Sequence, residues 1–311
     1  MDPGGWCSAG LRAAGRAEER RAYLLLALPA VSLYLAVVAF PTVFSLGLSV
    51  TDYNGGPLFG EGRALNFRGL EHYVRMFQDR FFWISLKNNL AIIGISVFGQ
   101  IPLGFIMAYV LYRKLVGWRD FFQTMIYLPT VISTIVVGIL WQSFFSPYGP
   151  FTRLMQSIQP GWENTLFLNP KTAMLPVLFV MLWMYTGTYL IIFLASLQKI
   201  EPELIEAAKI DGANEWQVLG RVILPALSGV LVTTIILAIS GSLKSFDLIF
   251  AMTAGNPARR TSVLSLYMYD TAFRGAPDFP LANAVSTFMV MLSLGLIGIV
   301  RLLEKRLGGD A

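Results

Sequence analysis

The sequence predicts an all-α membrane protein with six transmembrane helices. Hydrophobic residues make up 55% of the 311 residues, and the mean hydropathy is +0.59. A soluble domain is far less apolar. Six apolar runs are long enough to cross a bilayer, which takes about 20 helical residues. The runs cover about 22–50, 83–112, 121–145, 173–197, 224–251 and 281–303.

The first apolar run follows an arginine-rich segment, residues 12–21. It is longer than the apolar core of a secretory signal peptide, and no small-residue cleavage site follows it. We therefore predict an uncleaved first helix over 22–50, behind a cytoplasmic tail of residues 1–21. Pro29 and Pro41 are expected to kink this helix.

The other five runs are predicted to form a transmembrane core, residues 83–303, after a polar extracytoplasmic loop, residues 51–82. Basic residues gather at the short connections, for example Arg113 and Lys114 between the second and third runs. The positive-inside rule puts these connections in the cytoplasm. Because the number of runs is even, the N-terminal tail and the C-terminal tail, 304–311, lie on that side. The predicted location is the cytoplasmic (inner) membrane.

The sequence contains no familiar catalytic, nucleotide-binding or metal-binding motif. It lacks the Gly-x-x-x-x-Gly-Lys-Ser/Thr phosphate loop, Gly-x-Ser-x-Gly and His-Glu-x-x-His. The one cysteine, Cys7, cannot form a disulfide within the chain, and the one histidine, His72, has no cluster of ligands near it. The net charge of +5 does not indicate nucleic acid, since the basic residues lie beside apolar runs. We therefore predict that the chain is not an enzyme and binds no cofactor or metal.

The polar segment at about 200–222, between the fourth and fifth runs, is predicted to form a helical elbow. Pro202 can occupy the first helical turn, where its missing N–H is not needed. Glu203 is favoured there by the helix dipole. Gly212 supplies the positive φ that ends a helix and begins a turn. A second short helix is expected to start at Glu215.

This elbow resembles the EAA loop of ABC-importer permeases, with Val222 where the family usually has Ile. The resemblance rests on the spacing over some twenty positions of Glu206, Ala207, Ala208, Asp211, Gly212, Leu224 and Pro225. An ordinary amphipathic loop is the alternative. In the family this loop is a coupling helix that docks into a separate ATPase subunit. The resemblance implies a type I ABC importer permease fold, with ATP and Mg²⁺ used by the partner subunits.

Other stretches are similar to sugar permeases of the maltose and glycerol-3-phosphate type. They are residues 65–73, 83–89, 246–257 and 261–273, with Asn256 where a glycine is usual. The resemblance implies three kinds of partner: a second permease in a heterodimer, two ATPase subunits and an extracytoplasmic solute-binding protein.

Polar side chains within the apolar runs mark a candidate substrate pathway. A polar group in hydrocarbon is costly, so these residues should face a partner helix or water. Hydroxyls, amides and aromatic faces suit a neutral sugar. The candidates are Tyr185, Thr188 and Tyr189 on the fourth run, Ser242, Ser245 and Asp247 on the fifth, Asn88 on the second and Asn283 on the sixth.

Each of these residues also has an ordinary structural interpretation. Tyrosines anchor helices at the membrane surface, and serines and threonines bond to their own helix. Lys244 and Asp247, at i and i+3, can neutralise each other. Glycerol-3-phosphate or another polyol is the alternative substrate, but only Lys244 offers a cation for it. An ion-coupled secondary transporter is the alternative from another class, and a membrane enzyme would need a catalytic constellation that is not visible.

Overall fold

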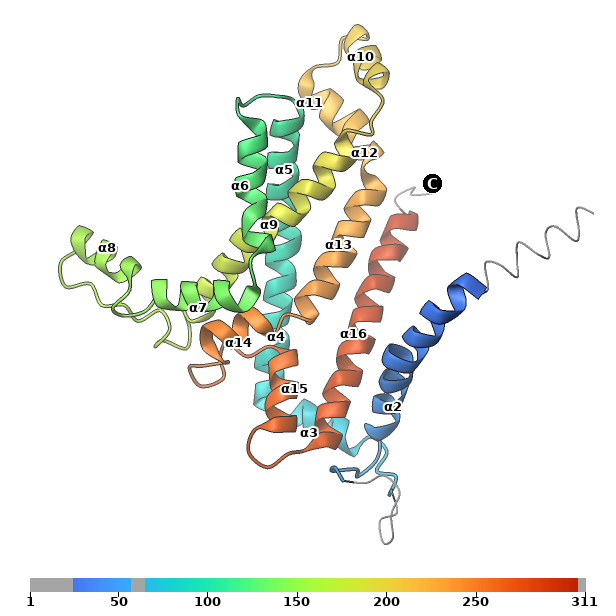
Figure 1. Ribbon diagram of the computed structural model, residues 1–311, viewed down its shortest axis with the longest axis vertical. Coiled ribbons are helices and arrows are strands. Elements are labelled where there is room, and N and C mark those ends of the chain that lie inside the picture. The colour runs from blue at the N-terminus through green and yellow to red at the C-terminus, as the bar shows by residue number, and fades with distance from the viewer. Residues whose placement is uncertain (1–24, 57–64, 307–311) are drawn as a thin grey trace, which may run out of the picture.

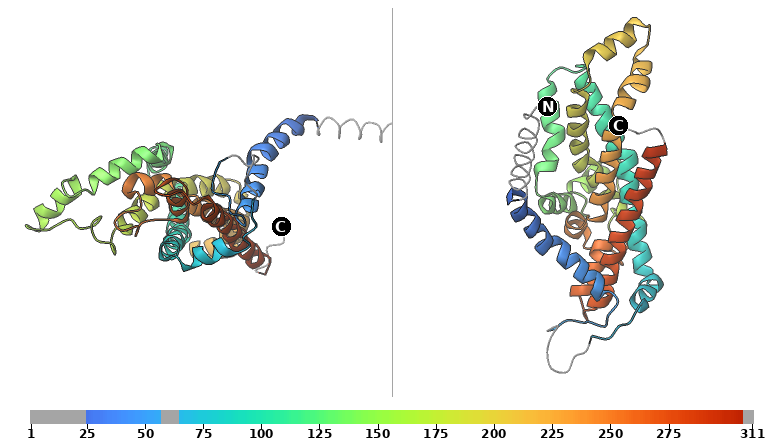
Figure 2. Two further views of the ribbon diagram at one scale, coloured as in Figure 1. Left: turned by 90° about the horizontal axis from the view of Figure 1, so that it is seen from below. Right: turned by 90° about the vertical axis from the view of Figure 1, so that its right-hand side faces the viewer.

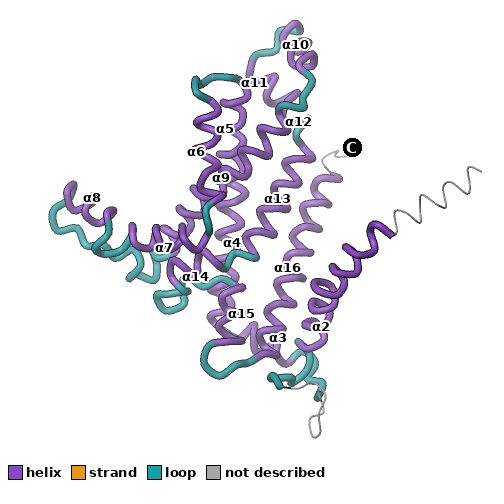
Figure 3. Tube along the Cα trace, viewed as in Figure 1, coloured by secondary structure: helices purple, strands orange, loops and turns teal. Residues whose placement is uncertain are grey.

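The computed structural model describes residues 25–56 and 65–306 of the chain. The predicted N-terminal tail, Cys7 and the last five residues, 307–311, lie outside this range. Apart from one antiparallel bridge between Thr51 and Phe67, the regular structure of the described residues is helical. Figure 3 shows helices along most of the trace, with loops gathered at the two ends and around α8.

Within the described residues, four continuous helices are long and apolar enough to cross a membrane. They are Leu25–Leu48, Arg80–Tyr112, Met174–Leu197 and Phe279–Arg306. Two bent pairs complete a set of six, if each pair counts as one span. The four helices contain η1 (Leu35–Ala39) and α2 (Phe40–Leu48); α4 (Arg80–Ile95), η2 (Ser96–Gln100) and α5 (Ile101–Tyr112); α9 (Met174–Leu197); and α16 (Phe279–Arg306).

The sequence suggested one helix over the third apolar run, but the structure has two. α6 (Arg119–Val131) and α7 (Thr134–Phe144) are bent by 96°. Pro129 stands in the last turn of α6, and Ile132 after it is extended, with φ −74 and ψ 143. A proline weakens the helix around it, because it removes a backbone donor and crowds the preceding turn. α7 therefore runs sideways toward α8 (Pro150–Ile158) (Figure 1).

The fifth apolar run is also interrupted, and its helix is shorter than predicted. α13 (Ser228–Leu243) ends before the predicted limit of residue 251, and a separate helix, α14 (Asp247–Thr253), follows. Ser245 and Asp247 therefore lie at a break rather than within a span. At its other end α13 is bent by 67° from the helix Glu215–Ala226. That helix contains α11 (Glu215–Val218), η3 (Leu219–Ile223) and α12 (Leu224–Ala226).

α9 is the central helix of the bundle, and it packs on both α5 and α6. Its buried side chains include Met184, Leu190 and Phe193. A Cβ added to Gly104 of α5 would lie 2.7 Å from the Cβ of Tyr189. This contact means that only a glycine lets the two helix backbones approach so closely.

The first helix stands at one side of the bundle and α8 at the other, as Figure 2 shows. The end opposite α10 (Pro202–Ile210) is closed by α3 (Glu71–Gln78), α15 (Leu264–Phe273) and the start of α16. Phe82, Tyr267 and Val285 form a buried apolar cluster there. We refer to this as the outer end and to the end that carries α10 as the coupling end, after the roles that the sequence analysis predicts for them.

Candidate functional site

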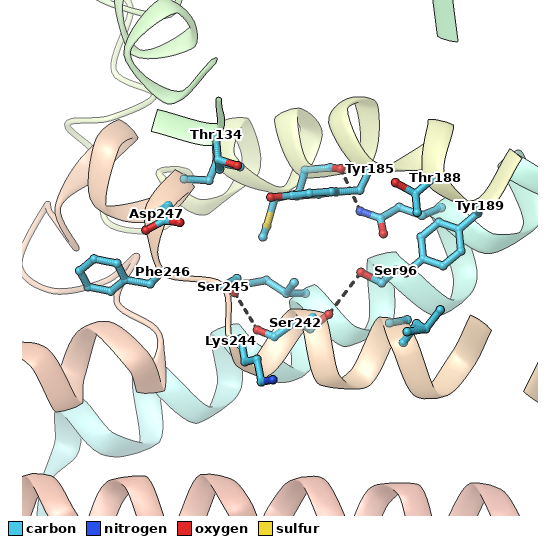
Figure 4. A pocket seen from close by; sticks show the side chains of 17 residues that line it. Ser96, Thr134, Tyr185, Thr188, Tyr189, Ser242, Lys244, Ser245, Phe246 and Asp247 are labelled. Carbon is cyan, nitrogen blue, oxygen red and sulfur yellow. Dashed lines mark hydrogen bonds between the residues drawn. The ribbon is translucent and has the colours of Figure 1, made fainter. Parts of the chain in front are cut away.

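A cavity of about 300 Å³ lies between α9, α13 and η2, inside the helical bundle (Figure 4). The interruptions of the helices create it, because the break after α13 and the bend after α6 turn polar side chains into one space. Its polar lining consists of Ser96, Gln100, Thr134, Tyr185, Thr188, Tyr189, Ser242, Lys244, Ser245 and Asp247.

The fourth span contributes the three side chains that the sequence placed on one face. Tyr185, Thr188 and Tyr189 all line the cavity, as their i, i+3, i+4 spacing on a helix requires. Tyr189 is only 7% exposed, and its Cβ and backbone lie close to Gly104 of α5. This helix thus presents two aromatic faces and three hydroxyls to one space.

The break between α13 and α14 contributes a second polar wall. The Oγ atoms of Ser96 and Ser242 lie 3.3 Å apart, and Ser245 Oγ donates to the Ser242 carbonyl at 2.7 Å. Asp247 opens α14 with its carboxylate on the cavity.

The alternative interpretation, in which Lys244 and Asp247 neutralise each other, is wrong. No ion pair joins them among the described residues, and their side chains point to different sides of the connection (Figure 4). The i, i+3 argument requires a single helix. Here α13 ends at Leu243 and α14 begins at Asp247, so that condition fails.

Three polar lining residues were not singled out in the sequence, namely Ser96, Gln100 and Thr134. Ser96 and Gln100 bound the π-helix η2, and π-helical turns often occur at functional sites. Gln100 Nε2 donates to the Met181 carbonyl of α9 at 2.9 Å. Ser96 and Gln100 are polar residues within a long apolar run, and this feature of the sequence could have identified them.

Two predicted pathway residues lie outside the cavity lining. Asn88 donates through Nδ2 to the carbonyls of Arg260 and Ser262, each at 2.7 Å. Asn283 accepts a hydrogen bond of 2.7 Å from Ser45 Oγ of the first helix. The Asn88 amide therefore joins α4 to the connection between α14 and α15, and the Asn283 amide joins α16 to the first helix.

The predicted elbow forms the coupling end, and its local structure follows the sequence argument. Pro202 begins α10, and Gly212 has φ +83 in the turn before α11. Glu206, Ala207 and Asp211 are exposed to solvent on it. Leu224 and Pro225 lie beyond the elbow, in α12.

Large apolar side chains on the elbow are also exposed. Ile210 is 86% exposed and Trp216 is 81% exposed, while Ile205 is buried and attaches α10 to the bundle. An apolar surface surrounded by charge is typical of a protein interface.

Polar contacts stabilise the fold of the elbow and join it to the bundle. Asn214 and Gln217 form a reciprocal capping box at the start of α11. Glu215 pairs with Lys209 at 3.1 Å and with Arg113 of the α5–α6 connection at 2.6 Å. The hydrogen bond from Lys209, aided by the charge of Arg113, lowers the pKa of the Glu215 carboxyl.

Comparison with known proteins gives consistent results along the chain. The family described as binding-protein-dependent transport system inner membrane component matches residues 100–309. The lactose transport system permease protein LacF of Rhizobium radiobacter is 33% identical over 271 residues, covering 85% of this chain and 87% of that protein. The trehalose transport system permease protein SugA of Mycobacterium tuberculosis is 29% identical over 304 residues, covering 96% and 92%.

A solved structure has the same arrangement of helices. It is a bacterial alginate ABC transporter in complex with an alginate pentasaccharide-bound periplasmic protein. The TM-score is 0.78 at 25% sequence identity, over 94% of this chain and 97% of that chain.

Proposed function

Since the chain belongs to the family of binding-protein-dependent transport system inner membrane components, we propose that it is a permease subunit of an ATP-driven ABC importer for a sugar or an oligosaccharide. Its fold is the type I permease fold. The observation that carries the proposal is the cavity between α9, α13 and η2, which joins aromatic faces to hydroxyls inside an apolar bundle.

The chemistry of the cavity favours a neutral saccharide. Sugars present many hydroxyl groups and apolar ring faces, which hydroxyl donors and tyrosine rings complement. Among the described residues that line the cavity, Lys244 is the only cation and Asp247 the only carboxylate. A phosphorylated or uronic substrate would call for more positive charge. Relatives named for lactose and trehalose transport agree with this preference.

The elbow is proposed to receive the movement of a separate ATPase. ATP and Mg²⁺ would be bound by two ATPase subunits, and a second permease would complete the membrane part. Glu206 on exposed α10 would dock by charge-assisted hydrogen bonds, each worth roughly 1.5–3 kcal/mol. Ala207 and Ala208 would allow close approach. The proposed orientation puts the coupling end and both termini in the cytoplasm and the outer end against a solute-binding protein.

Two continuous connections lead from the elbow to the cavity. α9 runs directly from Tyr185 and Tyr189 to the start of α10, and η3 with α12 leads from α11 into α13. A rigid displacement of α10 would therefore move two walls of the cavity together. This coupling explains how a solvent-exposed loop could open or close a site inside the membrane.

The test is ATP-dependent uptake by the complete transporter reconstituted in vesicles, with the binding protein present on the outside. Labelled lactose, trehalose and glycerol-3-phosphate are the substrates. Tyr185→Ala should reduce sugar uptake at least about tenfold, since one lost interaction of 1.4 kcal/mol has that effect. Tyr34→Ala, a change in a side chain 59% exposed on the first helix, is the matched control.

Three outcomes would contradict the proposal. Uptake driven by an ion gradient without ATP would indicate a secondary transporter. A preference for glycerol-3-phosphate over both sugars would refute the neutral substrate. Equal uptake by the Tyr185→Ala and Tyr34→Ala proteins would exclude the cavity as the pathway.

A further inference from the structure

A second cavity, of about 180 Å³, lies at the coupling end between α5, α6 and α9. Leu111 and Leu194 form its buried apolar part. Its polar lining includes two cations, Lys114 and Arg119, and the amide of Gln198. The tight α5–α6 connection brings the cations together, with left-handed backbone at Lys114 (φ 54) and at Trp118 (φ 56).

The charged residues that line this cavity, Lys114 and Arg119, are both cations, and no carboxylate lies among the lining residues that the structure describes. Lys114 takes part in none of the ion pairs of the described residues. Among the described residues the one ion pair of Arg119 is with its neighbour Asp120, at 3.6 Å, and the Asp120 side chain is 93% exposed. Lysine and arginine are donors only, and a guanidinium has five N–H groups to offer. The complementary ligand is an anion with several acceptor oxygens, such as a phosphate group.

The surroundings of the cavity favour a phosphate that carries acyl chains. On the same connection Leu115 is 66% exposed and Trp118 is 83% exposed. Phe121 and Met125 continue an exposed apolar surface along α6, at 52% and 47%. Tryptophan and basic residues together are typical of the headgroup level of a membrane. A soluble phosphate or nucleotide would gain nothing from this apolar surface.

We propose that this cavity binds the headgroup phosphate of an anionic phospholipid, with its acyl chains along α6. Basic pockets between membrane helices bind such headgroups through charge and hydrogen bonds. The assignment to the cytoplasmic leaflet rests on the proposed orientation of the importer. The proposal that the cavity binds a lipid does not depend on that orientation.

The position of the cavity connects the lipid to the elbow. Gln198 is the C-cap residue of α9, in the short connection that leads to α10 at Pro202. Arg113, next to Lys114, pairs with Glu215 of α11 at 2.6 Å. A phospholipid bound here would join the α5–α6 connection to α9 where the movement of the ATPase would enter. Sugar uptake should therefore be faster in vesicles that contain phosphatidylglycerol than in vesicles of phosphatidylcholine alone.

The experiment titrates short-chain phosphatidylglycerol into the purified complete transporter and measures Kd by calorimetry. Short-chain phosphatidylcholine and inorganic phosphate are the comparison ligands. K114Q/R119Q should weaken phosphatidylglycerol binding roughly 30-fold and each single variant about fivefold, on the usual contribution of one cation near a membrane. K114R/R119K keeps both charges and should bind normally. K305Q/R306Q removes two exposed charges at the end of α16 and should also bind normally.

Each result decides the matter. Unchanged Kd in K114Q/R119Q and in both single variants would overturn the proposal, as would equal loss in K305Q/R306Q. Equal affinity for inorganic phosphate and phosphatidylglycerol would show a free phosphate site instead. Equal affinity for phosphatidylcholine would exclude charge recognition. Because the titration needs neither ATP nor sugar, its failure is distinct from failure of the proposed transport function.

Discussion

Replacement of Gly212 tests whether the turn of the elbow transmits movement. Gly212 has φ +83, and a Cβ added there would meet nothing within 4 Å. Its substitution therefore strains the backbone without creating a clash. Left-handed backbone costs an L-residue roughly 1–2 kcal/mol, which corresponds to a shift of about 5–30-fold in the population of the native turn. Valine, being β-branched, should exceed this cost, and asparagine should fall below it.

The expected result is loss of coupling in the order Asn, Ala, Val. A relaxed turn would move α10 relative to α11, so that Glu206 no longer meets the ATPase as before. ATP hydrolysis should continue while sugar uptake falls, and the number of ATP molecules used per sugar should rise. Both rates are measured on the same reconstituted complex.

Gly220 provides the matched control. It lies in the same segment, in η3, where an added Cβ also meets nothing within 4 Å and the backbone is helical. In the Gly220→Val protein, ATP hydrolysis should therefore remain more tightly coupled to sugar uptake than in the Gly212→Val protein. Normal uptake by Gly212→Val, or equal defects in both proteins, would refute the role assigned to the turn.

Three further changes test the packing and the charges. Gly104→Val should destabilise the protein by about 1–3 kcal/mol in thermal unfolding, since overpacking forces α5 from α9; Gly94→Val, where an added Cβ meets nothing within 4 Å, should not. Gln100→Ala removes the side-chain donor that Gln100 offers to the Met181 carbonyl and should cost about 0.5–1.5 kcal/mol and slow uptake; wild-type behaviour would contradict this. The pKa of Glu215 is lowered in the folded protein, so its ionised form contributes to the free energy of unfolding. That contribution is fully present above the ordinary glutamate pKa, about 4.3, and is lost as pH falls through the lowered pKa of the folded protein. Glu215→Gln should remove this dependence of stability on acid pH.

The sequence was sufficient for features that depend on neighbouring residues. Apolar runs of sufficient length predicted six membrane segments, and four continuous helices and two bent pairs of the described residues correspond to them. The preference of proline for a first turn and of glycine for positive φ predicted the start of α10 at Pro202 and the turn at Gly212 that follows its end. The shared face of Tyr185 and Tyr189 follows from 3.6 residues per turn. These features are local, so no other part of the chain can alter them greatly.

The tertiary structure decided where helices break and which faces meet. An uninterrupted apolar run contains little information about a break, so the separation of α13 from α14 could not be read from it. The Gln100 side chain is held at the cavity by its hydrogen bond to Met181, which is 81 residues away in the sequence. Asn88 bonds to Ser262, which is 174 residues away in the sequence. In a bundle of uniformly apolar helices, many pairings bury similar surfaces. Close packing and the few buried polar bonds select one of them, and they involve residues far apart in the chain.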